Sequence, residues 1–169
     1  MSNPFDVFLT EPPTLNIQLV ASTNVDCNGN NSGELIVVAS GGTQPYLNFT
    51  LTGSSNSVNN NGVFSNLPAG NYVVEVEDYN NCTNTINEII TSPPPLSNPI
   101  LAVTNPSCYG FSDGNIDLTV NGGTIPYTFD WSNGENSEDV GFLSSGFIEV
   151  TVTDNNAVSY THLTLPTIE

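Results

Sequence analysis

Acid–base or nucleophilic catalysis needs residues that this chain largely lacks. Its 169 residues include one histidine, His162, and no lysine or arginine. A Ser-His-Asp arrangement needs a histidine near a serine, and a phosphate-binding glycine loop needs its lysine. The pairs Glu75/Glu77 and Glu138/Asp139 have the chemistry of glycosidase carboxylates, but strand alternation places Glu75 and Glu77 on a solvated face. We therefore expect no catalytic residue, no cofactor-binding residue and no enzyme.

Oxygen ligands for a cation are the second chemistry to consider. Asp78–Asn81 and Asp154–Asn156 are equivalent loops rich in aspartate and asparagine. Calcium takes carboxylate, amide and backbone oxygens from such loops. The alternative is that each aspartate organises its own turn by accepting bonds from nearby backbone amides. Asp78 and Asp154 are thus weak calcium candidates, and we expect no other metal site.

Disulfide formation is the third chemistry to consider, because the chain has three cysteines. Cys27 and Cys108 occupy the same position in two copies of one unit, and Cys82 closes the first copy. Because Cys27 should precede an early strand and Cys82 follow a late one, we expect a disulfide that staples the first copy. Free, buried thiols are the alternative. Cys108 is then left unpaired, because Val158 stands where its partner would be.

The charge of the chain excludes two classes of partner. Seventeen acidic residues and no basic ones give a formal net charge of −17. Nothing is present to neutralise nucleic-acid phosphates or to dock on anionic lipids. No apolar run reaches the length of a membrane span, and Met1–Thr10 lacks the basic and apolar parts of a secretion signal. A signal for export would therefore lie outside this chain.

The residues above recur because the chain repeats itself. Thr10–Tyr46 reappears without a gap as Thr91–Tyr127, 81 residues later. Further on, Leu67–Asp78 matches Leu143–Asp154 at an offset of 76 residues, so the second copy is shorter by five residues in one connection. Tandem copies of one unit indicate an array.

Alternation of apolar and polar residues predicts strands throughout. The residues expected to face a core are Leu35, Val37 and Ala39; Tyr72, Val74 and Val76; Ile116, Leu118 and Val120; Ile148, Val150 and Val152. One packed and one solvated face is typical of antiparallel sheets. With turns every 8–12 residues, each unit is expected to be an Ig-like β-sandwich of about six or seven strands.

Glycine and proline mark the turns and the boundaries. Gly-Gly-Thr-x-Pro-Tyr, at Gly41–Tyr46 and Gly122–Tyr127, predicts a turn before a strand. Consecutive prolines predict a semi-rigid extended joint that holds neighbouring units apart. The expected domains are the end of a preceding repeat with its joint at 1–15, repeat 1 at 16–90, a joint at 91–97, a truncated repeat 2 at 98–157, and a non-native tail at 158–169.

The tail is set apart because its sequence breaks the pattern. Val158–Thr167 resembles the conceptual translation of a transposase-type sequencing adapter and starts where the last strand should turn. We exclude it, with His162, from functional reasoning.

The motifs together resemble a known repeat. They are Cys-x-Gly-x-x-x-Gly-x-Ile/Leu, Gly-Gly-Thr-x-Pro-Tyr, Trp-Ser-Asn-Gly and Leu-x-x-Gly-x-Tyr-x-Val-x-Val-x-Asp-x-x-x-Cys. This series is similar to the SprB repeat, which occurs in tandem in very large surface adhesins of gliding Bacteroidetes. The resemblance covers Cys27–Cys82 and Cys108–Asp154. The first copy departs from it at Leu51–Gly53, which replaces Trp-Ser-Asn-Gly, and the second lacks the final cysteine.

The resemblance implies type IX secretion, display at the bacterial cell surface, and a non-enzymatic structural or adhesive role linked to gliding motility. The alternative is a spacer or glycan-binding accessory repeat in a secreted multidomain enzyme. A surface polysaccharide or other extracellular ligand is the expected partner. Its contacts would be the outward aromatics Tyr109, Phe111 and Phe147, whereas Tyr127, Phe129 and Trp131 are expected in the core.

Overall fold

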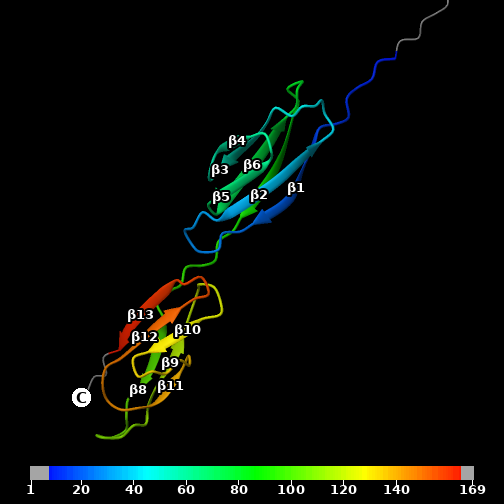
Figure 1. The fold of residues 1–169 in the computed structure, drawn as a ribbon. Coiled ribbons are helices and arrows are strands. Elements are labelled where there is room, and N and C mark those ends of the chain that lie inside the picture. Colours follow the sequence, from blue (N-terminus) through cyan, green and yellow to red (C-terminus); the bar gives the residue numbers. More distant parts are fainter. Residues whose placement is uncertain (1–7, 165–169) are drawn as a thin grey trace, which may run out of the picture. The chain divides into compact units, whose positions relative to one another are not determined.

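The computed structural model describes residues 8–164, and every regular element in that range is a β-strand. The described residues divide into two compact units, one of residues 8–25 and 29–91 and the other of residues 26–28 and 92–164 (Figure 1). We call residues 8–91 repeat 1 and residues 92–164 repeat 2. The division falls at the start of the predicted joint. None of the described residues forms a helix long and apolar enough to cross a membrane. The all-β, antiparallel fold class is confirmed.

Repeat 1 is a sandwich of two antiparallel sheets. Its strands are β1 (Asn16–Thr23), β2 (Gly33–Ser40), β3 (Asn48–Gly53), β4 (Ser57–Asn59), β5 (Val63–Leu67), β6 (Gly70–Glu77) and β7 (Thr83–Ile90). One sheet has the order β1-β2-β5 and the other β4-β3-β6-β7. The first, second and fifth strands thus face the third, sixth and seventh, which is the immunoglobulin-like arrangement.

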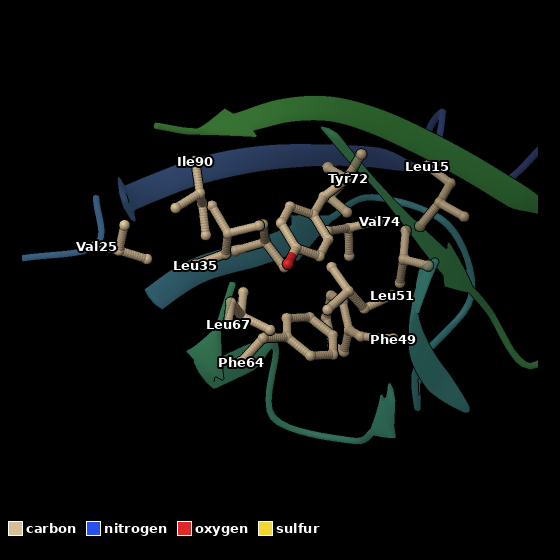
Figure 2. Packing of buried hydrophobic residues seen from close by; sticks show 13 residues of the cluster. Leu15, Val25, Leu35, Phe49, Leu51, Phe64, Leu67, Tyr72, Val74 and Ile90 are labelled. Atoms are coloured by element: carbon tan, nitrogen blue, oxygen red, sulfur yellow. The ribbon is translucent and has the colours of Figure 1, made fainter. Parts of the chain in front are cut away.

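The core of repeat 1 lies between these sheets. Leu35 of β2, Leu51 of β3 and Tyr72 of β6 point toward one another in Figure 2, and each is almost fully buried. The alternation expected from the sequence is confirmed, because every second side chain of β6 from Tyr72 to Val76 is buried while the residues between them face outward.

Repeat 2 has the same plan with one strand fewer among its described residues. Its strands are β8 (Ile100–Thr104), β9 (Gly114–Thr119), β10 (Thr128–Trp131), β11 (Val140–Leu143), β12 (Ile148–Thr153) and β13 (Ser159–Thr164). The sheets are β11-β9-β8 and β10-β12-β13, so β4 is the strand of repeat 1 without a counterpart.

The structure corrects where the five residues are lost. Phe49 pairs with Val76, and Phe129 pairs with Val152, which lies 76 residues after Val76. Phe129 is therefore the counterpart of Phe49 at an offset of 80. One residue is missing before this strand, and four are missing between it and the strand after it, where β4 lies in repeat 1. The loss is divided between two connections.

Trp131 fills the core of repeat 2. It is 2% exposed, lies in one cluster with Ile116 and Val150, and its indole Nε1–H donates to the carbonyl of Ser137 at 2.8 Å. Tyr127 and Phe129 pack against this cluster with partly buried side chains, as expected.

The boundary placed at residue 157 is wrong for the fold. Ser159–Thr164 forms β13, which pairs with β12 in continuous register from Thr153↔Ser159 to Ile148↔Thr164. A ladder of this kind is made by backbone groups, so its formation depends weakly on side-chain identity. Repeat 2 thus includes the strand equivalent to β7. Residues 165–169 of the predicted tail lie outside the described residues.

Candidate functional site

Each repeat has two different ends. In repeat 1, β1 and β7 begin at the end where the chain arrives, because Asn16 pairs with Ser40 and Glu77 with Thr83. We call this the leading end. Both strands finish at the opposite end, which we call the trailing end. It holds the Gly70↔Ile90 pair and the start of β2 at Gly33.

The Gly-Gly-Thr-x-Pro-Tyr turn lies at the leading end and is bonded to the preceding joint. The Tyr46 hydroxyl donates to the carbonyl of Gly41 at 3.0 Å, and the Gly42 amide donates to the carbonyl of Pro13 at 2.7 Å. The counterparts in repeat 2 are Tyr127 to Gly122 at 2.5 Å and Gly123 to Pro94 at 3.0 Å. The motif therefore fastens each repeat to the proline joint before it.

A buried aspartate ties this turn to the β6–β7 turn. Asp78 is 1% exposed, and its Oδ2 accepts the Thr43 amide at 2.8 Å. Its Oδ1 accepts the amides of Asn80 and Cys82, each at 2.9 Å. In repeat 2, Asp154 accepts the amides of Thr124, Asn156 and Val158, each at 2.9 Å. One carboxylate thus holds two turns together at the leading end of each repeat.

These bonds favour the charged form of both carboxyl groups. The Thr43 amide, with those of Cys82 and Asn80, holds the pKa of Asp78 below its ordinary value of 3.8 despite burial. Burial opposes the charged form of Asp154, but the amide bonds outweigh it, so the pKa of Asp154 is also lowered. A carboxylate that accepts several backbone N–H bonds behaves in this way.

Both aspartates therefore have the turn-organising role that the sequence left as the alternative to calcium binding. Their oxygens face backbone amides inside the repeat, and a cation would have to displace those bonds. Among residues 8–164, no group of three or more acidic, histidine or cysteine side chains is arranged to hold a metal ion.

The expected disulfide between Cys27 and Cys82 is wrong within one repeat. All three cysteines are free; Cys27 is half-buried, and Cys82 and Cys108 are exposed. The Val25 amide donates to the carbonyl of Thr91 at 3.1 Å, so Cys27, two residues further on, lies near the trailing end. Cys82 precedes β7 at the leading end. Nine residues of extended chain separate Cys82 from Thr91, or about 30 Å, whereas bridged cysteines need Cα atoms within about 7 Å.

The remaining candidates stay apart from one another. Glu75 and Glu138 are exposed, and Glu77 is partly exposed. Asp139 accepts the Leu118 amide at 2.9 Å, a structural role. His162 lies on β13 opposite Val150. No catalytic arrangement is formed by these side chains.

The outward aromatics of repeat 2 are exposed as expected. Tyr109 and Phe111 lie in the loop after β8, and Phe147 precedes β12. Phe147 and the exposed Phe142 line a hollow of about 410 Å³ at the trailing end. In repeat 1, Ile90 closes this end, with its side chain against Gly33. The counterpart of Ile90, at position 166, lies outside the described residues.

The sequence placed Tyr72 in the core but did not predict the role of its hydroxyl group. The Tyr72 hydroxyl donates to the carbonyl of Pro68 at 2.8 Å, which is the tyrosine corner of immunoglobulin-like sandwiches. The sequence signal for the tyrosine corner was a tyrosine near the start of the sixth strand, four residues after Pro68. Repeat 2 has Ile148 at this position and has Trp131 where repeat 1 has Leu51.

Residues 19–56 and 100–136 match the family model of the SprB repeat. The resemblance found in the sequence is confirmed, and the match indicates a repeat segment of an adhesin-type cell-surface protein. No curated protein matches the chain.

Among solved structures, the chain is similar to a C-terminal 282-residue fragment of intimin, crystallised in complex with the intimin-binding domain of the translocated intimin receptor. The identity is 17% and the TM-score 0.40, over 92% of this chain and 64% of that chain. The fold assignment rests on the sheets described above and not on this likeness.

Proposed function

We propose that this chain is a non-enzymatic segment of a large secreted adhesin, in which tandem sandwiches serve as structural repeats at the bacterial cell surface. The observation that carries this proposal is the fastening of each repeat to its joint. The same turn, aspartate and proline carbonyl recur in both repeats. A structural repeat needs a reproducible junction more than it needs a reactive site.

The charge supports the same role. Acidic side chains such as Glu75 and Asp130 lie on exposed strand faces, and no basic residue is present to neutralise them. A net charge of one sign keeps a long array soluble and discourages contact between copies. Proline joints add stiffness between units. Export by the type IX route and a part in gliding motility are what the resemblance to SprB repeats implies, and they belong to this proposal.

Surface labelling tests the proposal. Antibodies raised against the purified chain are expected to stain intact source cells, and external protease should remove the signal. A cytoplasmic protein, labelled on the same cells, serves as the control for intactness. Staining that appears only after permeabilisation would contradict display at the surface.

Direct binding of a surface polysaccharide is the second candidate, favoured by the aromatic hollow of repeat 2. Sugar rings stack on exposed aromatic faces, and Phe142 and Phe147 offer two beside one hollow. A glycan-array signal that is lost in Phe147→Ser and kept in Tyr79→Ser, an exposed tyrosine of repeat 1, would support it. Equal signals from both variants, or no signal from the unaltered chain, would contradict glycan binding and leave the structural role as the remaining candidate.

A further inference from the structure

Four exposed aromatic side chains of repeat 2 stand where repeat 1 has asparagine. The pairs are Tyr109 for Asn28, Phe111 for Asn30, Phe142 for Asn66 and Phe147 for Asn71. Each of the aromatic side chains is at least 54% exposed, so none of them fills the core. Because the same exchange occurs at four positions, it points to a surface of repeat 2 that repeat 1 lacks.

The four aromatic residues lie at one end of repeat 2. Two of them are in the loop between β8 and β9, and the other two lie beside the loop between β11 and β12. The hydroxyl groups of Ser112 and Ser144, 2.8 Å apart, join these two loops. Gly114, at the start of β9, pairs with Leu143, which follows Phe142. Both loops are therefore at the trailing end, beside the hollow of about 410 Å³.

Phe142 has a backbone conformation that phenylalanine rarely adopts. Its φ is 56°, and its counterpart Asn66 has a φ of 57°. Asparagine enters this left-handed region readily, whereas a bulky side chain is strained there. The Phe142 side chain is 91% exposed, so packing within repeat 2 does not offset the strain. Strained residues of this kind cluster at ligand-binding sites, and contact with a ligand accounts for this phenylalanine better than the fold does.

The hollow is lined by uncharged groups. Among the described residues, those that line it include no acidic one, although the chain has 17 acidic residues. Asn105, Asn115 and Ser145 belong to the lining, and their side chains make no hydrogen bond to another described residue. Amide and hydroxyl groups beside exposed aromatic rings suit a sugar, which has hydroxyl groups to bond and apolar C–H faces to stack. The volume is within the range of small-ligand pockets, about 300–1,000 Å³.

We propose that the trailing end of repeat 2 binds a short stretch of an uncharged polysaccharide, with Phe142 and Phe147 stacked on its sugar rings. An anionic polysaccharide would meet a chain of net charge −17 that has no basic residue, so charge repulsion excludes it. An apolar protein segment would cover Asn105 and Asn115 without giving their amide groups partners, which costs free energy.

This assignment rests on polysaccharide binding, the second candidate function above. It adds the class of the ligand and the end of the repeat that holds it. It also restricts binding to repeat 2, because repeat 1 has asparagine at the four matching positions.

Phe142→Asn tests the site, because it gives repeat 2 the residue that repeat 1 has at this position. Binding is measured by surface plasmon resonance on immobilised neutral glucan, mannan and galactan, with alginate and a sulfated polysaccharide on the same chip. The unaltered chain is expected to bind at least one neutral polysaccharide, and the variant to bind it about tenfold more weakly. In the absence of ligand, relief of the strain should move the urea midpoint of Trp131 fluorescence upward. Tyr79→Asn, at a 63% exposed position of repeat 1, is the control and should bind like the unaltered chain.

The other outcomes separate this site from polysaccharide binding in general. Binding to the acidic polysaccharides alone would overturn the ligand class, and equal binding by Phe142→Asn and Tyr79→Asn would overturn the site; the second candidate function would survive both results. A lower urea midpoint for Phe142→Asn would overturn the site by making Phe142 a residue of the fold.

Sedimentation and the full panel supply the last two outcomes. A concentration-dependent dimer that Phe142→Asn abolishes would assign the hollow to a second copy of the chain and overturn the proposal. If the unaltered chain bound none of the polysaccharides, the site and the second candidate function would both be wrong, and the structural role would remain.

Discussion

At the scale of single residues, one aspartate organises the leading end of each repeat. Asp78 binds three backbone amides from two turns, and Asp154 repeats the arrangement. A local pattern identified these loops as places for oxygen ligands. The local pattern could not show whether the Asp78 carboxylate binds a cation or backbone amides. Thr43, whose amide it accepts, lies 35 residues away in the sequence and comes close to Asp78 only in the folded chain.

The lowered pKa of Asp78 predicts a pH dependence. Since the pKa is lower in the folded chain than its ordinary value of 3.8, the charged carboxylate stabilises the fold above that pH. This contribution is lost as the pH falls through the folded pKa. Urea unfolding of Asp78→Asn is therefore expected to show lower stability at pH 7 and a smaller further loss in acid than the unaltered chain.

Glu75→Gln is the matched control for this experiment, because it removes one acidic charge from the exposed face of β6. It should leave stability at pH 7 nearly unchanged. If Asp78→Asn behaved like Glu75→Gln at pH 7, the amide bonds of Asp78 would not stabilise the repeat as argued.

At the scale of elements, the sequence predicted the strands well and their ends poorly. Inward residues such as Val37 and Val150 could be assigned because alternation along a strand is a local property. The Cys27–Cys82 pairing failed because spacing along a chain says nothing about which end a turn occupies. The directions of the strands would have shown that the two cysteines lie at opposite ends. Cys27 follows the first strand, which finishes at the trailing end, and Cys82 precedes the seventh, which begins at the leading end.

The Gly-Gly turn allows a test at this scale. Gly123 has φ +65°, and an added Cβ would lie 3.0 Å from Asp154 Oδ2. Gly123→Ala is therefore expected to destabilise repeat 2 by about 1–2 kcal/mol or more, from backbone strain alone. Unfolding followed by Trp131 fluorescence measures it.

Gly146→Ala is the control for the same repeat, because no atom lies within 4 Å of its added Cβ. We expect it to change the midpoint little. If the two variants unfolded at the same denaturant concentration, the second glycine of the motif would not be required by the geometry of the turn.

At the scale of the whole molecule, the two repeats have separate cores. Leu51 lies in the core of repeat 1, and Trp131, the only tryptophan of the chain, lies in that of repeat 2. This organisation was predictable from the duplication, because two copies of one sequence are expected to form the same fold twice, each with its own core. The lost β4 and the strand β13 could not be predicted, because they depend on pairing across a sheet and not on local pattern.

Separate cores predict separate unfolding. Leu51→Ala is expected to destabilise repeat 1 by about 2–5 kcal/mol, which circular dichroism will show, while the Trp131 fluorescence transition keeps its midpoint. Val58→Ala, at an exposed position of β4, is the control and should move neither signal. A fluorescence midpoint that falls together with the dichroism would contradict independent repeats.

The central claim is that these sandwiches are structural repeats of a surface adhesin, and a long-read sequence of the source locus tests it most directly. If these are adhesin repeats, the reading frame through codon 157 and upstream of codon 1 is expected to carry further copies of the repeat and to end in a secretion-sorting domain. A hydrolase domain in the same frame would contradict it, since the repeats would then be spacers and the function would belong to that domain.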